Sequence, residues 1–311
     1  MALGNLAQRF LVAVVAVPIL LVLFYYHRPE PTWLLVFAAS LIAMHEAFAM
    51  LLPAADRRAA LVLGGVAVAA FYWLDPLAIA AYGEAVPHAL AGAVRAGATV
   101  PLLLAVVAPG LYYLFRFRDI PTVAGRYAGT VAGIVYAGYL LTYLAKLKLL
   151  DVVIPPARGD ETVAFVHTSA TSAHGGDAVL IVLLVAWVAD TGGYFAGRFL
   201  GKTRLYEAVS PKKTWAGAWG GLVGSIVGVA VLKLISADWL TWLDVFLIAI
   251  PGGILGQLGD LTESLIKRSV GVKDSGSLLP GHGGLLDRID AVLFIGPYVY
   301  AYLVIRSAIG I

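Results

Sequence analysis

Long apolar segments with almost no charge constrain this chain more than any other feature. A helix needs about 20 apolar residues to cross the hydrocarbon core of a bilayer, because its backbone polar groups must be satisfied internally. The pattern predicts an all-α fold, a polytopic transmembrane helical bundle of about nine spans. The expected spans are residues 10–26, 33–52, 59–74, 101–115, 127–150, 178–197, 214–236, 240–258 and 291–309.

Composition supports the membrane interpretation. Of the 311 residues, 60% are hydrophobic and only 13% are charged, whereas soluble domains carry roughly 25% charged residues. This excludes a soluble globular protein and a disordered one. The net charge of +3 argues against a nucleic-acid partner, and the absence of cysteine excludes disulfides and thiolate metal sites. We expect an N-terminal transmembrane bundle in residues 1–177 (spans 1–5) and a C-terminal transmembrane region in residues 178–311 (spans 6–9), which contains the candidate catalytic residues considered below.

The basic residues predict how the chain is oriented. With nine spans and the N-terminus inside, fifteen of the 22 Lys and Arg residues fall on one side of the membrane. Cytoplasmic loops carry the Lys and Arg excess, so this side is expected to face the cytoplasm, in an inner membrane. The two longest basic loops follow spans six and eight and would share that face. The fifteen are Arg9, Arg57, Arg58, Arg116, Arg118, Arg126, Arg198, Lys202, Arg204, Lys212, Lys213, Lys267, Arg268, Lys273 and Arg288.

Charge and glycine concentrate between residues 260 and 290. Nine of these 31 residues are charged, against 13% in the whole chain. Asp260, Glu263 and Lys267 would share one helix face, and Asp287 and Asp290 are also three apart. Such carboxylates suit Mg²⁺, which takes a few of them together with water and substrate phosphates. The alternative is a solvated loop with ordinary charged helix ends. Basic residues suited to phosphate oxygens are interleaved with the acids: Lys267, Arg268, Lys273 and Arg288.

A second constellation begins inside span six. Asp190 lies in an apolar segment, either as a buried acid paired with a neighbouring helix or as a ligand of the metal cluster. The glycines that follow it would allow close helix packing or close approach to a phosphate. Downstream, a helix is expected to open at about Thr214, and lysines and hydroxyls beside a helix N-terminus could bind a triphosphate. The residues concerned are Lys202, Ser210, Lys212, Lys213 and Thr214.

Two histidine positions give weaker signals. His45 and Glu46 lie within span two, where a packed polar pair or a helix end is about as probable as a function. His282 lies in the Gly-rich segment and could be a general base or a phosphate contact. A phosphate monoester is already largely ionised at neutral pH, so we favour a positioning role for His282.

The residues now described resemble the signature of the phosphatidate cytidylyltransferases, also called CDP-diacylglycerol synthases. The resemblance is carried by residues 264–268 (SLIKR) and 273–290 (KDSGSLLPGHGGLLDRID), with 259–263 (GDLTE), 210–214 (SPKKT) and 190–192 (DTG). It covers about 130 C-terminal residues, whereas the first five spans match only in being hydrophobic. One departure is Ala216, where the family commonly has an acid or amide, which would affect CTP binding.

The resemblance implies an enzyme, a nucleotidyltransferase that makes CDP-diacylglycerol from CTP and phosphatidic acid with Mg²⁺. Whether a second cation also takes part is left open. The resemblance also implies a homodimer in the lipid bilayer. The expected metal ligands are Asp260, Asp287, Glu263 and Asp190. Lys267, Arg268, His282 and Arg288 would act with Asp260 and Asp287 in catalysis. Lys202, Ser210, Lys212, Lys213, Thr214 and Lys273 would bind substrate. The alternatives are a CTP-dependent lipid kinase, which would release CDP, and a membrane transporter.

Overall fold

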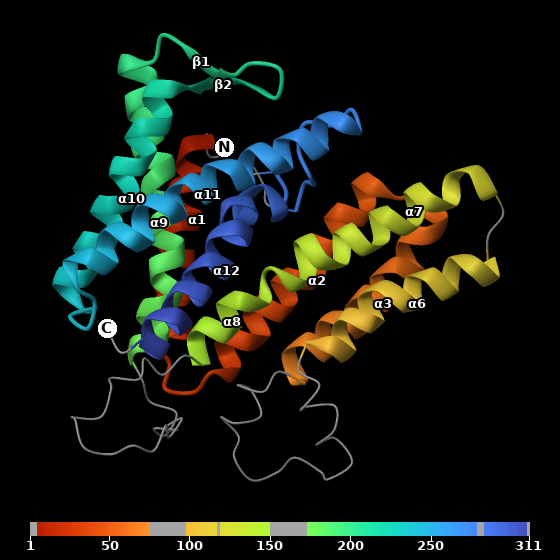
Figure 1. The fold of residues 1–311 in the computed structure, drawn as a ribbon. Helices are drawn as coiled ribbons and strands as arrows, with labels where there is room; N and C mark the ends of the chain where they lie inside the picture. The colour runs from red at the N-terminus through yellow and green to blue at the C-terminus, as the bar shows by residue number, and fades with distance from the viewer. Residues whose placement is uncertain (1–4, 75–97, 117–118, 150–172, 279–282, 310–311) are drawn as a thin grey trace. The chain divides into compact units, whose positions relative to one another are not determined.

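The part of the chain that the structure describes folds almost entirely into helices (Figure 1). The computed structural model describes residues 5–74, 98–116, 119–149, 173–278 and 283–309, with the backbone alone for residues 5–13. The elements before residue 150 are α1 (Asn5–Tyr25), α2 (Glu30–Leu51), α3 (Ala54–Trp73), α6 (Thr99–Arg116), α7 (Ile120–Gly133), the π-helix η1 (Ile134–Tyr139) and α8 (Thr142–Leu149). The later ones are α9 (Ala173–Leu200), β1 (Arg204–Tyr206), β2 (Ser210–Thr214), α10 (Trp215–Ile235), α11 (Trp242–Ser269) and α12 (Leu286–Ile309).

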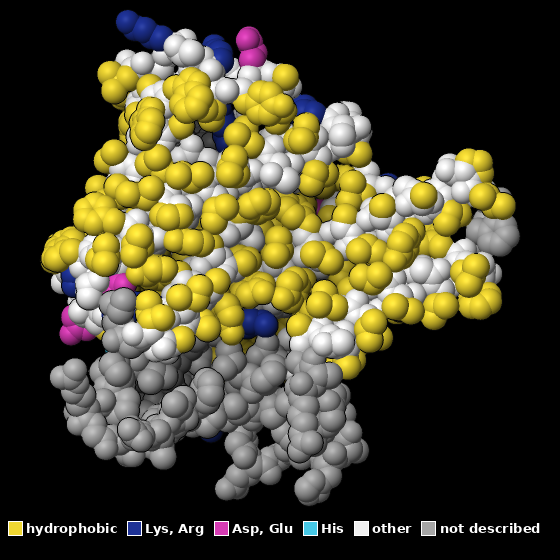
Figure 2. Space-filling model, in the orientation of Figure 1, with side chains coloured by type: hydrophobic (Ala, Val, Ile, Leu, Met, Phe, Trp, Pro, Cys, Tyr) yellow, Lys and Arg dark blue, Asp and Glu magenta, His cyan; other side chains and the backbone are white. Residues whose placement is uncertain are grey.

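The expected all-α polytopic bundle is confirmed, with a span count close to the predicted one. All nine expected segments are helical over most of their length, and seven helices in the described part of the chain are long and apolar enough to cross a membrane. The other two are α1, whose described apolar part is Val14–Tyr25, and α3, whose first turns carry Asp56, Arg57 and Arg58. Hydrophobic side chains are spread over the whole described part of the face seen in Figure 2, where charged side chains are few. The protein is therefore an integral membrane protein.

Two local features depart from the expected helices. Residues 210–214 form strand β2 rather than a loop, and β2 pairs antiparallel with β1 in a short hairpin. The segment expected as one span over 127–150 contains the π-helix η1 between α7 and α8. Such π-turns arise where one extra residue is accommodated within a helix.

The chain packs as two compact units. Unit 1 comprises Met1–Leu149 and Val270–Arg288, and unit 2 comprises Leu150–Ser269 and Ile289–Ile311. Most of the Gly-rich segment thus packs with the N-terminal helices, which the sequence did not indicate. The functional division at residues 177 and 178 stays a prediction.

The core of unit 1 forms around α2. Met44 and Phe48 are fully buried, and glycines let the α7–η1 segment approach them closely. A Cβ at Gly138 would lie 2.9 Å from the Met44 sulfur, and one at Gly133 would overlap the Phe48 ring. These contacts fix the packing of α2 against the α7–η1 segment.

In unit 2, α9 and α10 run side by side and are joined by the β1–β2 hairpin (Figure 1). Glycines of each helix contact the backbone of the other: a Cβ at Gly192 would overlap the Gly220 carbonyl oxygen, and one at Gly193 would lie 3.2 Å from that of Gly217. Small residues allow such close packing in membranes, where no hydrophobic force drives helices together. The helix-packing interpretation of the glycines after Asp190 is therefore correct for Gly192.

Candidate active site

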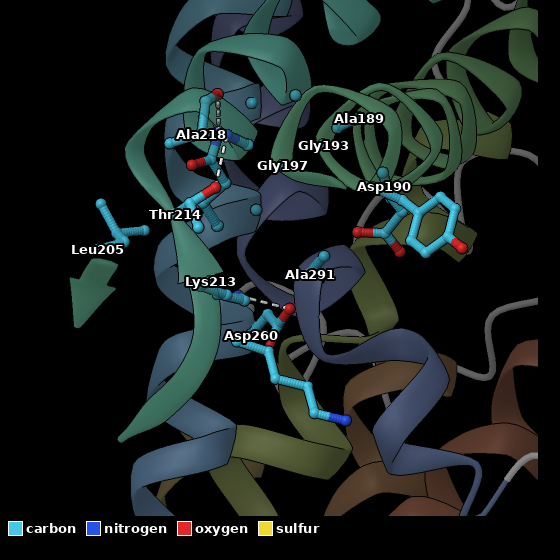
Figure 3. A pocket seen from close by; sticks show the side chains of 18 of the residues that line it. Ala189, Asp190, Gly193, Gly197, Leu205, Lys213, Thr214, Ala218, Asp260 and Ala291 are labelled. Atoms are coloured by element: carbon cyan, nitrogen blue, oxygen red, sulfur yellow. Dashed lines mark hydrogen bonds and ion pairs between the residues drawn. The ribbon is translucent and has the colours of Figure 1, made fainter. Parts of the chain in front are cut away.

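Unit 2 contains a cavity of about 440 Å³ at the end of the α9–α10 pair that bears the hairpin. Its walls come from α9, the hairpin, α10, α11 and the first turns of α12 (Figure 3). Backbone at Gly193, Gly197 and Gly217 lines part of it, so these glycines serve both packing and the cavity. The polar side chains of its lining are Asp190, Tyr194, Arg198, Lys212, Lys213, Thr214, Gln257 and Asp260.

An ion pair joins the hairpin to α11 at this cavity. The Lys213 ammonium lies 2.6 Å from the Asp260 carboxylate, and the side chains are 26% and 33% exposed, respectively. A phosphate would attract the lysine, while a divalent cation would attract the aspartate. The pair therefore offers one partner to each half of a metal–nucleotide complex. The expected meeting of the basic segment after span six with the acidic end of span eight is observed here.

Helix α10 begins beside the cavity, and its start at Thr214 is where the sequence predicted a helix to begin. Thr214 is its N-cap, and the hydroxyl accepts a hydrogen bond of 3.1 Å from the Gly217 N–H. The remaining N–H groups of a first turn attract anions, and Lys212 and Lys213 precede this turn directly. Ala216 is not among the described residues that line the cavity, whereas Thr214, Gly217 and Ala218 are.

Carboxylates gather beside the Lys213–Asp260 pair. The Asp290 carboxylate lies within electrostatic range of those of Asp260, Glu263 and Asp190. Glu263 is only 1% exposed and is neutralised by an ion pair with Lys267, one turn further along α11. Within the described residues, no three His, Asp or Glu side chains are arranged so as to hold a metal ion by themselves. Mg²⁺ does not require such a cage, since it commonly uses one or two carboxylates with water and substrate phosphates.

The Gly-rich segment is organised in unit 1 by two carboxylates. Asp287, in the first turn of α12, accepts hydrogen bonds from the Ser275 N–H at 3.0 Å and the Gly284 N–H at 2.9 Å. Gly283 has φ +82°, and a Cβ there would lie 2.8 Å from the Asp287 carboxylate. Glu46 of α2 accepts from the Ser275 hydroxyl at 3.2 Å and from the Leu285 and Leu286 N–H groups at 3.0 and 2.8 Å.

The structure separates the predicted site residues into groups. Those lining the cavity are Asp190, Lys212, Lys213, Thr214 and Asp260. Those elsewhere in unit 2 are Lys202, Ser210, Glu263, Lys267 and Arg268, and those in unit 1 are Lys273, Asp287 and Arg288. His282 lies outside the described residues. Because Asp260 and Asp287 belong to different units, their sharing of one cation stays a prediction.

Sequence reasoning missed several residues of the site. Tyr194, Arg198 and Gln257 line the cavity, and Gln257 donates a hydrogen bond of 3.1 Å to the Ala218 carbonyl. Gln257 lies three residues before Asp260, so its helical spacing was the available signal. For Glu46, the sequence did not favour a functional role over a packed polar pair. A carboxylate in an apolar span is nevertheless costly in free energy and usually has a function.

Comparison with known proteins agrees with this site. The pattern of the "Cytidylyltransferase family" matches residues 7–306. A phosphatidate cytidylyltransferase of Synechocystis is 38% identical over 200 residues, which cover 62% of this chain and 67% of that protein. One of Bacillus subtilis is 39% identical over 143 residues, 46% of this chain and 53% of that protein. A chloroplastic one of Arabidopsis thaliana is 39% identical over 182 residues, 57% of this chain and 44% of that protein.

The aligned regions thus span from 44% to 67% of the length of these relatives. The family pattern, in contrast, covers nearly the whole chain and includes both the cavity and the Gly-rich segment. This chain belongs to the cytidylyltransferase family.

Proposed function

We propose that the protein is a phosphatidate cytidylyltransferase. It transfers CMP from CTP to phosphatidic acid and gives CDP-diacylglycerol and pyrophosphate. The observation that carries this proposal is the Lys213–Asp260 pair at a cavity onto which the N-terminus of α10 opens. The names of the relatives supply the substrate class.

CTP would enter the cavity with its phosphates towards the hairpin. Lys212 and Lys213 provide two positive charges, and the N–H groups at the start of α10 provide neutral donors. Thr214 holds that first turn in place through its cap. Lys202 and Ser210 lie in the same segment of the chain as Lys212 and Lys213. We propose that these two residues, and also Lys273, bind substrate as the sequence predicted.

The donor set at the cavity fits Mg²⁺. Asp260 would hold the ion with Asp190, while Glu263 supports the site through Lys267; Asp287 remains a proposed ligand. Carboxylates combined with substrate phosphate oxygens are what this hard cation prefers. When bound, Mg²⁺ would neutralise charge on the α-phosphate and on the departing pyrophosphate. Room for a second cation is part of the proposal, because Asp290 adds another carboxylate nearby.

The lipid would approach from within the bilayer, held there by its acyl chains. Arg268 is exposed one residue after Lys267 near the end of α11, and Arg288 is exposed near the start of α12. We assign them, with Lys267 and His282, to the lipid phosphate. An oxygen of that phosphate attacks the α-phosphorus of CTP in line, a new P–O bond forms, and the bond to pyrophosphate breaks. Positioning and charge stabilisation would give most of the rate increase, without a covalent enzyme intermediate.

Two further parts of the proposal concern location and assembly. The excess of Lys and Arg on one side supports an active site at the cytoplasmic face of an inner membrane. The family resemblance supports a homodimer. Cross-linking in membranes and labelling of the hairpin from either side would test these two statements.

The function is tested by following two radioactive labels in CTP. Purified protein is incubated with phosphatidic acid, Mg²⁺ and CTP labelled at either the α- or the γ-phosphorus. Cytidylyl transfer carries only the α-label into the organic phase, whereas a CTP-dependent lipid kinase would carry only the γ-label. A transporter would carry neither. Transfer of the γ-label, or of no label, would disprove the proposal.

A further inference from the structure

Glu46 has an unusual position for an acidic residue. It lies in the C-terminal part of the apolar helix α2, five residues before the helix ends, and it is only 5% exposed. Its carboxylate accepts hydrogen bonds from groups on both sides of the Gly-rich segment: the Ser275 hydroxyl on one side, and the Leu285 and Leu286 N–H groups on the other. A buried carboxylate is costly unless it is hydrogen-bonded in this way.

Two glycines leave room for this carboxylate. A Cβ at Gly276 would lie 2.6 Å from one Glu46 oxygen, and a Cβ at Gly284 would lie 2.6 Å from the other. Any larger residue at either position would displace the acid or the segment. The local backbone is therefore shaped around Glu46.

The same residues also hold Asp287. Ser275 donates its hydroxyl to Glu46 and its N–H to Asp287, and Gly284, which packs against Glu46, donates its N–H to Asp287. Because Leu286 is the first residue of α12, its bond to Glu46 also anchors that helix start. A change at Glu46 would thus reach Asp287 through two shared neighbours.

We propose that Glu46 is a positioning residue for the signature segment, holding Ser275 and the start of α12 so that Asp287 keeps a fixed orientation. It acts through these neighbours and does not contact substrate. The inference rests on the proposed cytidylyl transfer, because its main readout is the rate of that reaction. It gives the N-terminal half of the chain a part in the chemistry.

Glu46→Gln tests the proposal with the smallest change in shape. The amide turns one acceptor into a donor that faces N–H groups, so the segment must shift. We expect kcat to fall by about 10- to 100-fold, since misplacing a positioned group by about 1 Å costs on the order of 100-fold. The KM for CTP should stay within about threefold of wild type, because the cavity that binds CTP is built from other residues. Glu30→Gln on the same helix is the matched control, and it should behave like wild type.

Three results would overturn the proposal. The first is a kcat of Glu46→Gln within about threefold of wild type, and the second is a Glu46→Gln protein in which KM and kcat change equally and the unfolding temperature falls below that of wild type. The third is a Glu30→Gln protein that loses as much kcat as Glu46→Gln. If Glu46→Gln does not fold, the kcat of Ser275→Ala tests the proposal in its place. This substitution removes one hydrogen bond and should lower kcat about threefold with KM unchanged, and an unchanged kcat would again refute the role. Failure of the proposed function would look different, because wild-type protein would then move no α-label into lipid.

Discussion

Helix α11 carries one aspartate in its first turn and another about two thirds of the way along, and the two have opposite surroundings. Asp244, in its first turn, has a side chain that is 2% exposed and lies 3.0 Å from the Arg306 guanidinium. Asp260 lies sixteen residues further on, about 24 Å along the axis, and its side chain is 33% exposed. Both aspartates form an ion pair, and Asp260 lines the cavity of the candidate active site, whereas Asp244 is not among the described residues that line it.

The partners of Asp244 leave it fully engaged. Its Oδ1 accepts a hydrogen bond from the Tyr302 hydroxyl at 2.6 Å, and its Oδ2 accepts from the N–H and hydroxyl of Thr241 at 2.6 and 2.8 Å. Arg306 also donates to the Trp239 carbonyl at 3.0 Å. This network joins α10–α11 and α12 at one end of unit 2, so we interpret it as structural.

The comparison teaches that pairing alone does not separate a structural acid from a reactive one. What separates them is how much of the carboxylate is committed to the protein. Among the described residues, Asp260 contacts Lys213 and, at a weak 3.4 Å, the Ser264 hydroxyl, which leaves it able to exchange partners.

Asp260→Asn should have the largest effect. Losing the charge removes the metal ligand and frees Lys213, so we expect cytidylyl transfer to fall on the order of 1000-fold, or about 4 kcal/mol of barrier. The thermal unfolding temperature in detergent should change little. The assay is α-labelled CTP transfer into lipid, with Glu207→Gln in the exposed hairpin turn as the control. Near wild-type turnover in Asp260→Asn would rule out its metal role.

Asp244→Asn should act on stability instead. The substitution leaves Arg306 buried without its charge partner, and breaking a buried pair costs about 3 kcal/mol. The measurement is unfolding of the purified protein, together with the KM for CTP, which should stay the same in the folded fraction. Asp238→Asn, an exposed aspartate close by in the chain, is the matched control. An Asp244→Asn protein with wild-type stability would contradict the structural interpretation.

Lys213→Met should raise the KM for CTP about 30-fold, or about 2 kcal/mol, because one charge-assisted phosphate contact is lost. Lys213→Arg keeps the charge and should recover much of the affinity. Binding is measured directly by titrating CTP against the unfolding temperature. If Lys213→Met binds CTP as tightly as wild type, the lysine serves only as the partner of Asp260.

Thr214→Val should have the smallest effect of the four. It keeps the side-chain size but removes the hydroxyl that caps α10, which typically costs about 1 kcal/mol of stability. Thr214→Ser retains the cap and should remain close to wild type. Unfolding curves of the two variants, recorded side by side, decide the matter. Equal stability of both would show that the cap is dispensable.

The sequence predicted the helices well because the membrane leaves few alternatives. A run such as residues 178–197 must satisfy its own backbone in lipid, so hydropathy and length suffice to place α9. The helix start at Thr214 was also predictable, since a threonine after the Pro211–Lys213 turn is a common cap. Asp190, Lys213 and Asp260 were identified because charge is rare in an apolar chain.

Other features could not be predicted because they depend on packing between distant residues. The bond from Glu46 to Leu286 joins positions 240 residues apart, and no local pattern in α2 indicates it. The Asp244–Arg306 network likewise joins α11 to the last turns of α12. Strand β2 was expected as a loop, since Pro211 and two lysines favour neither strand nor helix and pairing with β1 decides the outcome.

The hydrogen bonds between Glu46 and the Gly-rich segment have a practical consequence for expressing fragments of this protein. Expressing only residues 178–311, the stretch in which every recognisable motif lies, would produce a fragment lacking the acid around which its own motif is shaped. Co-expression with a separate piece containing α2 would be the way to restore it. Any shortened version of the protein should therefore keep both α2 and the Gly-rich segment. Any chimera with another member of the family should take both from the same protein.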